Sequence, residues 1–268
     1  MVEIAVAQFA PGVDKDENLR SVRALVADAA ARGAHVVVTP EYTSFTAPRT
    51  DERIVAAGEP LDGPFVTGLA GIAAEHDVTL VTGVAESIEG EERVHNTLVA
   101  ISPGGEIVAR YRKLHLYDAF GRTESTVIAP GPVTPPETFA VDGLTFGMQT
   151  CYDLRFPEVT RLLVDAGADV VCLPAQWVPG PLKEDHWTTL VRARAIENTV
   201  YVAAADQGPR TGAGHSMIVD PYGIVVTALG EQTGTAVATV TRSRLDSVRT
   251  ENPALELRRF AVTVRPGE

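Results

Sequence analysis

Residues 35–40, HVVVTP, form a run rich in β-branched residues that ends directly before Glu41. A second run of this kind, DVVCLPA at 169–175, lies in the other half of the chain. Strands that are apolar on both faces need cover on both sides, which sheets with helices packed outside them provide. The two runs therefore predict an α/β protein whose sheets are flanked by helices.

Strands and helices alternate outward from these runs. Leu19, Val22, Val26 and Ala29 keep helical spacing within residues 17–32, and Gly33 follows as a terminator. Further helices are predicted near 66–76, from Pro157 onward and around 184–197. Strands are predicted at 3–9, 79–85, 94–102, 106–114, within 138–150 and at 200–206. A hairpin at 215–229 and a strand at 235–240 complete the predicted pattern. No break in composition, repeat or low-complexity segment divides the chain, so one domain over residues 1–268 is expected.

The charge balance narrows the possible partners. The chain has 35 acidic and 23 basic side chains, a formal net charge of −12. This excess opposes binding to nucleic acid and to acidic membrane surfaces. No apolar run approaches the roughly 18 residues that a membrane span needs, and the first residues, MVEIAVAQFA, lack the pattern of a secretory leader. A cytoplasmic location is therefore expected.

Three reactive side chains follow predicted strands: Glu41 after HVVVTP, Lys113 after IVARYR and Cys151 after LTFGMQT. Ligands bind beyond the carboxyl ends of strands in such sheets, so we expect the three to share a pocket. Pro157 is typical of the first turn of a helix, which places Cys151 on a strand-to-helix elbow. The positive end of that helix and the Lys113 ammonium are expected to favour the thiolate.

Each of these residues also has an ordinary structural interpretation, as a loop glutamate, a surface lysine or a buried small hydrophobe. Cys172, inside VVCLP, fits the last description and is interpreted as structural. His115 lies two residues after Lys113 and could orient a partner, although a hydrogen bond to a loop is the favoured interpretation. Neither a metal-binding spacing nor a phosphate-binding loop occurs, so neither metal nor cofactor is expected.

Six motifs resemble the nitrilase (carbon-nitrogen hydrolase) superfamily over nearly the whole chain. They are PEYT at 40–43, HNTL at 95–98, YRKLHLYD at 111–118, QTCYDLRFPE at 149–158, RARAIENTVYVAAA at 192–205 and GHSMIVDPYG at 214–223. The resemblance implies a four-layer αββα sandwich of two mixed sheets. It also implies homodimers or larger assemblies of this chain.

The resemblance also implies a role for each residue of the site. Glu41 would be the general base, Lys113 the oxyanion stabiliser and Cys151 the nucleophile that forms a thioester with release of ammonia. Glu124, in RTES, matches the second glutamate of the family and would position substrate or water; its ordinary interpretation is a loop carboxylate. The backbone N–H of Tyr152 would be a second oxyanion donor.

The stretch YDLRFPE is similar to the ω-amidase and deaminated-glutathione amidase branch, which acts on small carboxylates with a terminal amide. Arg155 would then bind the substrate carboxylate, or else form a structural ion pair with Asp153 or Glu158. Gln176 and Trp177 would form a further wall of the pocket. The stretch AADQGPRTGAG departs from the pattern of many relatives at Asp206 and Gln207, which puts the substrate preference in doubt. An N-carbamoyl amino acid hydrolase, a nitrilase and a catalytically silent scaffold remain alternatives.

Overall fold

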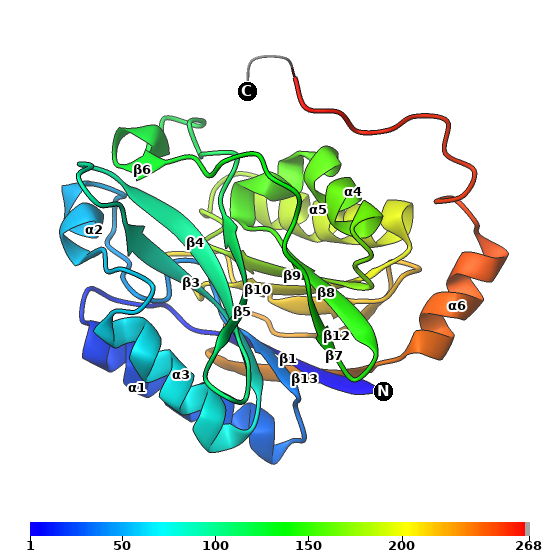
Figure 1. Cartoon of the computed structure of the whole chain (residues 1–268), viewed down its shortest axis with the longest axis horizontal. Coiled ribbons are helices and arrows are strands. Elements are labelled where there is room, and N and C mark those ends of the chain that lie inside the picture. The colour runs from blue at the N-terminus through cyan, green and yellow to red at the C-terminus, as the bar shows by residue number, and fades with distance from the viewer. Residues whose placement is uncertain (266–268) are drawn as a thin grey trace.

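Two mixed β-sheets lie face to face at the centre of the molecule, with helices on their outer faces (Figure 1). The computed structural model describes residues 1–265. The first sheet has the strand order β13-β1-β2-β3-β4-β5, with β6 paired to β4, and the second has the order β12-β11-β10-β9-β8-β7. The predicted four-layer αββα arrangement is confirmed.

The first sheet contains β1 (Val2–Gln8), β2 (Val36–Val38), β3 (Thr79–Ser87), β4 (Val94–Ile101), β5 (Ile107–Arg112), β6 (Ile128–Ala129) and β13 (Gly234–Val240). The second contains β7 (Phe139–Val141), β8 (Leu144–Met148), β9 (Val170–Ala175), β10 (Tyr201–Asp206), β11 (Met217–Val219) and β12 (Val225–Ala228). The helices are α1 (Lys15–Ala31), α2 (Glu52–Ala57), α3 (Pro64–His76), α4 (Pro157–Asp165), α5 (Lys183–Asn198) and α6 (Arg242–Glu251), with short 3₁₀ turns at η1 (Glu124–Thr126) and η2 (Cys151–Arg155).

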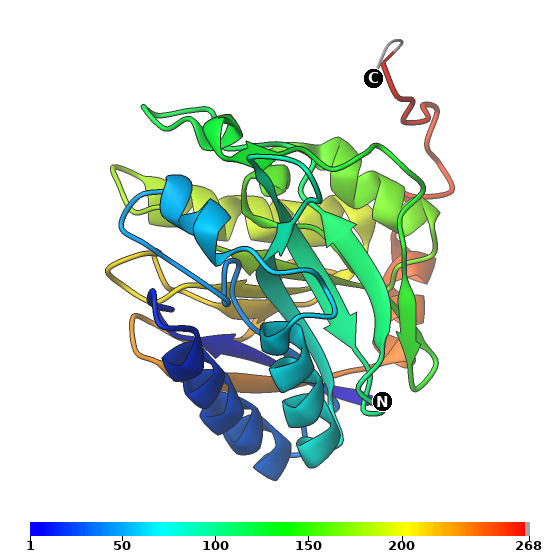
Figure 2. The same cartoon turned by 60° about the vertical axis from the view of Figure 1, so that its left-hand side comes forward.

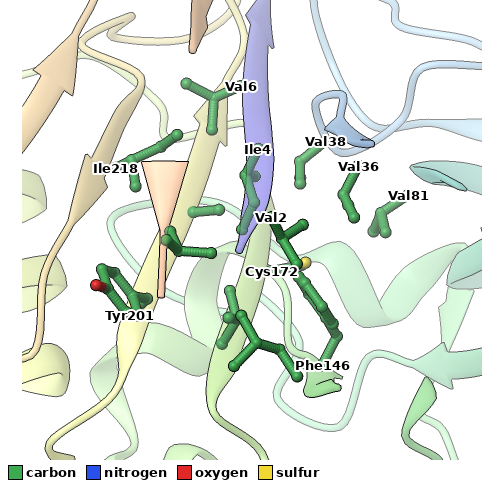
Figure 3. Close-up of a cluster of buried hydrophobic side chains, with 14 of the residues drawn as sticks. Val2, Ile4, Val6, Val36, Val38, Val81, Phe146, Cys172, Tyr201 and Ile218 are labelled. Atoms are coloured by element: carbon green, nitrogen blue, oxygen red, sulfur yellow. The ribbon is translucent and has the colours of Figure 1, made fainter. Parts of the chain in front are cut away.

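The alternation of side chains along β1 shows how the layers are built. Val2, Ile4 and Val6 point between the sheets and contact residues of the second sheet such as Phe146 (Figure 3). The intervening Ala5 and Ala7 belong instead to the core under α1 and α3. Because successive side chains of a strand point to opposite faces, one apolar strand serves two cores.

The covering helices follow from local sequence signals. Asp14 caps α1 by accepting a hydrogen bond from the Glu17 N–H at 2.9 Å, and the buried stripe of α1 includes Val22 and Val26. Pro157 opens α4 as predicted, and α4 and α5 cover the second sheet (Figure 2).

Two helices were not predicted from the sequence, α2 and α6. Ile54 is the buried residue of α2, while α6 buries Leu245 and Val248. So few apolar positions leave no helical periodicity to detect.

The run HVVVTP forms a shorter strand than expected, because the strand ends at Val38. No described helix is long and apolar enough to cross a bilayer.

Candidate active site

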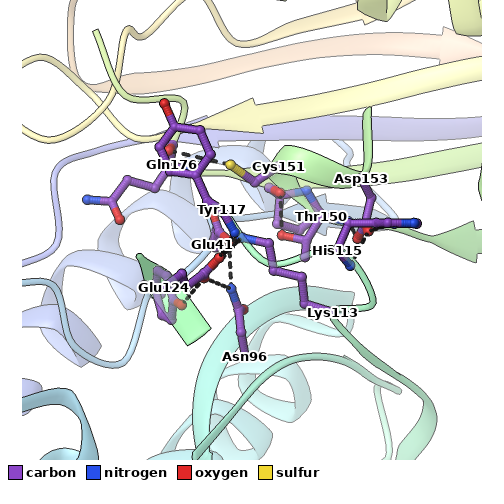
Figure 4. A network of polar contacts seen from close by, with 12 residues as sticks. Glu41, Asn96, Lys113, His115, Tyr117, Glu124, Thr150, Cys151, Asp153 and Gln176 are labelled. Carbon is purple, nitrogen blue, oxygen red and sulfur yellow. Dashed lines mark hydrogen bonds and ion pairs between the residues drawn. The ribbon is translucent and has the colours of Figure 1, made fainter. Parts of the chain in front are cut away.

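One cavity brings together segments that follow strands of both sheets. Glu41 follows β2 and Lys113 follows β5 in the first sheet, whereas Cys151 follows β8 in the second. All three line a cavity of about 550 Å³, and Figure 4 shows their side chains converging. The residues expected to meet at strand ends therefore do meet.

The carboxylate of Glu41 is held by donors on both oxygens. Oε1 accepts hydrogen bonds from Lys113 Nζ at 2.8 Å and from Asn96 Nδ2 at 2.6 Å, and Oε2 accepts one from the Gln176 N–H at 2.7 Å. Glu41 is only 1% exposed. The carboxylate is thus fixed in the cavity, where it can exchange a proton with a bound group.

The backbone at Glu41 is fixed from two sides. It lies against β3 at Gly83, where an added Cβ would be 2.8 Å from the Cα of Glu41. The buried Gln207 donates from Nε2 to the Glu41 carbonyl at 2.8 Å and to Thr46 Oγ1 at 2.9 Å. Gln207 is one of the two residues at which the sequence departs from the pattern of many relatives. Its side chain supports the loop that carries Glu41.

Glu124 shares the Lys113 ammonium with Glu41. Lys113 Nζ lies 3.0 Å from Glu124 Oε2. The Tyr42 hydroxyl donates to Oε1 of Glu124 at 2.5 Å, and the Tyr117 N–H donates to Oε2 at 2.5 Å. With 5% of its surface exposed, Glu124 is a buried member of the site and not an ordinary loop carboxylate.

The two glutamates keep Lys113 charged. Burial by itself lowers the pKa of an ammonium, but the carboxylates of Glu124 and Glu41 outweigh it and raise the pKa of Lys113 well above its usual value. The cavity therefore contains an ammonium that the two carboxylates hold in its charged form.

Cys151 occupies a sharp turn between β8 and α4. Its φ is +45°, in the left-handed region that non-glycine residues rarely adopt. The turn η2 begins at Cys151, and α4 starts only at Pro157. The thiol donates a hydrogen bond to the carbonyl of Gln176 at 3.5 Å. The strand-to-helix elbow expected from the sequence is present, with a 3₁₀ turn inserted in it.

The resting sulfur differs from the thiolate expected from the sequence. Burial raises the pKa of Cys151 well above its usual value, and the Glu41 carboxylate raises it further, while Lys113 acts in the opposite sense. Cys151 is therefore a thiol at neutral pH, and a base must remove its proton during the reaction.

A separate network holds the turn that carries Cys151. Asp153 accepts hydrogen bonds from the Tyr111 hydroxyl at 2.7 Å and from the Thr150 N–H at 3.3 Å. Nδ1 of His115 lies 2.9 Å from Oδ1 of Asp153, and the His115 ring stacks on Phe156 with 3.7 Å between the ring centroids. His115 thus holds a loop in place, as the favoured interpretation predicted.

Backbone donors lie at the start of the same turn. The first hydrogen bond of η2 runs from the Asp153 N–H to the Thr150 carbonyl at 3.0 Å. Among the described residues, the N–H groups of Cys151 and Tyr152, which precede it, donate no backbone hydrogen bond. The Tyr152 ring packs edge-on against Tyr117, with 5.1 Å between the ring centroids.

Gln176 and Trp177 line different parts of the surroundings of the thiol. Gln176 lines both the large cavity and a smaller side recess next to Cys151, whereas the buried Trp177 lines the recess alone. Asp206 holds this segment by accepting hydrogen bonds from the N–H groups of Trp177 at 2.7 Å and Ala213 at 3.0 Å. Gln176 thus forms a wall of the large cavity as predicted, while Trp177 belongs to the recess.

Arg155 does not form the structural ion pair considered as an alternative. In the described part of the chain its guanidinium is paired with neither Asp153, which binds His115, nor Glu158. Its Cζ lies 4.7 Å from the centroid of the Trp177 ring, and it lines the side recess with Tyr152.

Two contributors to the site were not assigned a role from the sequence, Asn96 on β4 and Tyr42. Asp153 was considered only as a partner of Arg155, whereas it binds the His115 segment. The motif HNTL contains Asn96, but its contact with Glu41 joins residues 55 positions apart. The pairing of β2 with β3 and of β3 with β4 brings them together.

Comparisons with known proteins agree with this arrangement. A family model described as carbon-nitrogen hydrolase matches residues 3–250. Deaminated glutathione amidase of Escherichia coli O157:H7 is 38% identical over 259 residues, which cover 96% of this chain and 97% of that protein. The crystal structure of Saccharomyces cerevisiae Nit3, a member of branch 10 of the nitrilase superfamily, has a TM-score of 0.85 and 26% identity and covers 97% of each chain. A third structure is an amidase variant of Nesterenkonia sp. AN1, which has a TM-score of 0.79 and 27% identity over 96% of this chain and 94% of that chain. That structure shows the acetamide moiety of fluoroacetamide added covalently at the active site cysteine.

Proposed function

This chain belongs to the carbon-nitrogen hydrolase family, and from that premise we propose that it hydrolyses the terminal amide of a small carboxylate through a thioester on Cys151. The observation that carries the proposal is a single ammonium, Lys113, which lies 2.8 Å from Glu41 and 3.0 Å from Glu124 in the cavity that Cys151 lines. Base, cation and nucleophile can therefore act on one carbonyl group.

In the first half of the reaction, Glu41 takes the thiol proton and the sulfur of Cys151 bonds to the amide carbon. The carbonyl oxygen becomes an oxyanion, which Lys113 and the Tyr152 N–H stabilise. Glu41 then gives its proton to the nitrogen, the C–N bond breaks and ammonia leaves. The acyl group remains on sulfur as a thioester, so atoms and charges balance.

In the second half, Glu41 removes a proton from water, and the resulting hydroxide bonds to the thioester carbon. The same donors hold the second oxyanion, which collapses with cleavage of the C–S bond. The proton on Glu41 returns to sulfur, so the products are a carboxylic acid and the resting thiol. The burial that raises the pKa of Cys151 makes a proton carrier necessary in both halves. The route uses protein groups and water, without a cofactor.

Two relatives support the choice of substrate class and of nucleophile. The Escherichia coli protein named deaminated glutathione amidase aligns over nearly its whole length. The Nesterenkonia amidase variant carries the acetamide moiety of fluoroacetamide covalently at its active site cysteine, which supports a cysteine as the nucleophile. Arg155, which lines the recess beside Cys151, is the proposed partner of the substrate carboxylate.

Mass spectrometry of the protein quenched during turnover tests the proposal. Incubation with small ω-amide acids should add the mass of the acyl group to the peptide that contains Cys151, and ammonia should be released. Cys172→Ala is the matched control, since Cys172 is fully buried in the core, and it should still be acylated. Ammonia release by Cys151→Ala, or turnover of N-carbamoyl amino acids or nitriles with no reaction of amides, would overturn the proposal.

The wider organisation of the protein is part of the proposal. We propose one domain over residues 1–268, a cytoplasmic location and assembly into a homodimer or larger homo-oligomer. The strand β12 at the edge of the second sheet presents the exposed side chains of Val225 and Val226, which supply apolar surface for a second copy. Light scattering in solution tests the assembly, and a monomer at all concentrations would contradict it.

A further inference from the structure

Asp206, the last residue of β10, is a fully buried carboxyl group that holds three segments of main chain. Its Oδ1 accepts hydrogen bonds from the Trp177 N–H at 2.7 Å and from the Gln207 N–H at 2.9 Å, and its Oδ2 accepts one from the Ala213 N–H at 3.0 Å. Within residues 1–265 every hydrogen bond to this side chain comes from a backbone N–H group. The sequence drew attention to Asp206 only as a departure from the pattern of many relatives.

The peptide group between Gln176 and Trp177 connects Asp206 to the catalytic residues. Its N–H, which belongs to Trp177, donates to Asp206, and its carbonyl, which belongs to Gln176, accepts the hydrogen bond from the Cys151 thiol at 3.5 Å (Figure 4). The Gln176 N–H donates to Oε2 of Glu41 at 2.7 Å. Because a peptide group is planar, a contact that fixes its N–H also fixes the direction of its carbonyl. Asp206 thus orients groups that contact both the sulfur and the base, although it does not line the cavity itself.

The same carboxyl group holds the loop at residues 207–216, between β10 and β11. The Ala213 N–H of this loop donates to Asp206 and also to the Trp177 carbonyl at 2.9 Å. Arg210 and Thr211 of the same loop line the large cavity. The loop therefore contacts the cavity at one point and Asp206 at another.

The loop is packed too closely to move without affecting its neighbours. A Cβ added at Gly212 would lie 2.3 Å from the carbonyl oxygen of Gln207. The backbone of Asp206 is fixed in turn, since its N–H donates to Ser216 Oγ at 2.9 Å and Ser216 Oγ donates to Gln8 Oε1 of β1 at 2.8 Å. With its backbone fixed, the side chain of Asp206 is the part that can transmit a displacement of the loop to the Gln176–Trp177 peptide.

We propose that Asp206 is a positioning residue that couples the loop at residues 207–216 to the catalytic residues through the Gln176–Trp177 peptide. This inference rests on the proposed function. The direction of that peptide determines how its carbonyl meets the Cys151 thiol and how the preceding N–H meets Glu41. Changes in the loop therefore alter turnover through Asp206.

Substitutions of Asp206 test the positioning role. With glutaramate, a small ω-amide acid, we expect Asp206→Ala to lower kcat by about 10- to 100-fold and to change KM by less than about threefold. Burial raises the pKa of Asp206 well above its usual value, so the neutral Asn is a close substitute. Asp206→Asn should keep kcat within about threefold, because its amide oxygen can still accept the Trp177 N–H.

Asp169→Ala is the matched control. Asp169 is also buried and accepts a backbone N–H, that of Thr145 at 3.0 Å, but it precedes β9, whereas Gln176 follows that strand. Its loss should destabilise the protein and leave kcat unchanged. Equal losses of kcat in Asp206→Ala and Asp169→Ala, or no loss in either, overturn the positioning role.

A double-variant cycle tests the coupling from the side of the loop. Gly212→Ala should displace the loop and lower kcat by at least about fivefold, whereas Gly71→Ala on α3, where an added Cβ meets nothing within 4 Å, should not. In the Asp206→Ala background, Gly212→Ala should lower kcat by less than about twofold, because the link is already absent. Fully additive losses mean that the loop acts by another route, such as Gln207, and overturn the coupling.

Hydrogen exchange followed by mass spectrometry gives a readout that does not depend on turnover. Exchange at the Trp177 amide should become at least about tenfold faster in Asp206→Ala and in Gly212→Ala, and should not change in Asp169→Ala. Unchanged exchange in Gly212→Ala overturns the coupling even if Asp206→Ala does not fold, and it leaves the proposed function standing. If the unmodified protein neither hydrolyses glutaramate nor is acylated at Cys151 by any small ω-amide acid, both proposals are overturned.

Discussion

His115 and Asp153 connect the segment that carries Lys113 to the turn that carries Cys151. The His115 N–H donates to Oδ1 of Asp153 at 3.1 Å, and Nδ1 of the same histidine lies 2.9 Å from that oxygen. Neither residue lines the large cavity. The contact joins the segment that follows β5 of the first sheet to the turn that follows β8 of the second, so we interpret His115 and Asp153 as positioning residues.

Loss of this connection should reduce turnover more than substrate binding. We expect His115→Ala to lower kcat by about 10- to 100-fold, because the attacking sulfur and the oxyanion donor no longer keep their relative position. KM should change by less than about threefold, since no substrate contact is removed. Steady-state kinetics on glutaramate would show this split. The exposed His35 lies outside the cavity, and His35→Ala is the control; a matching loss in both variants would contradict the positioning role.

The Glu41 carboxylate should be visible in the reactivity of the thiol. Glu41 raises the pKa of Cys151, so Glu41→Gln should lower that pKa. The rate of alkylation by iodoacetamide should then rise at a lower pH in the variant than in the unmodified protein, even though amide turnover is lost. Alkylation at Cys151 can be followed by peptide mass spectrometry, with the buried Cys172 as internal reference. A pH profile that stays in place, or moves to higher pH, would refute the coupling.

Lys113 should matter for folding as well as for turnover. We expect Lys113→Met to lower kcat by about 100-fold or more and the free energy of unfolding by about 3–5 kcal/mol. The variant leaves Glu41 and Glu124 as two buried carboxylates without their shared cation. Urea unfolding measures the second effect.

A double variant separates charge from packing at this position. Lys113→Met combined with Glu124→Gln should be more stable than Lys113→Met alone, since one of the two unpaired charges is removed. If the second substitution further destabilises the protein, the loss in Lys113→Met does not come from the unpaired carboxylates.

Gly83 should be essential for the position of Glu41 although it carries no side chain. In Gly83→Ala the new Cβ would approach Glu41 Cα and Tyr42 N to 2.8 Å, so the loop must move. We expect a loss of about 1–3 kcal/mol in stability and of at least about tenfold in kcat. Gly71→Ala on α3, where an added Cβ contacts nothing within 4 Å, should instead stabilise the protein by about 0.5–1 kcal/mol. Equal behaviour of the two variants in thermal unfolding and kinetics would argue against this explanation.

Local signals in the sequence were sufficient for most of the framework. The β-branched runs correspond to β2 and β9, Pro157 opens α4, and residues 15–31 form α1 with the expected buried stripe. These elements depend on short-range preferences and on periodicity, which a sequence displays directly. Helices α2 and α6 escaped prediction because they bury so few apolar side chains.

The state of the nucleophile depends on the tertiary structure. The helix start at Pro157 suggested a thiolate at Cys151, but the burial of the sulfur and the nearby Glu41 carboxylate reverse that expectation. Burial and the distance between charges are properties of the assembled layers. Only the fold reveals which charge dominates the pKa of a given group.

The amino-acid order by itself determined the alternation of strands and helices, the family resemblance and the identity of the reactive side chains. Each of these depends on residues that are neighbours in the sequence. The tertiary structure alone decided that Asn96 and Lys113 share the Glu41 carboxylate and that Lys183 joins Arg155 in one recess. These contacts join residues that are tens of positions apart, and only the pairing of strands and the packing of the layers bring them within hydrogen-bonding distance or into a shared cavity. Physical proximity between distant segments carries no local signal, and it is this proximity that turns separate reactive groups into a site.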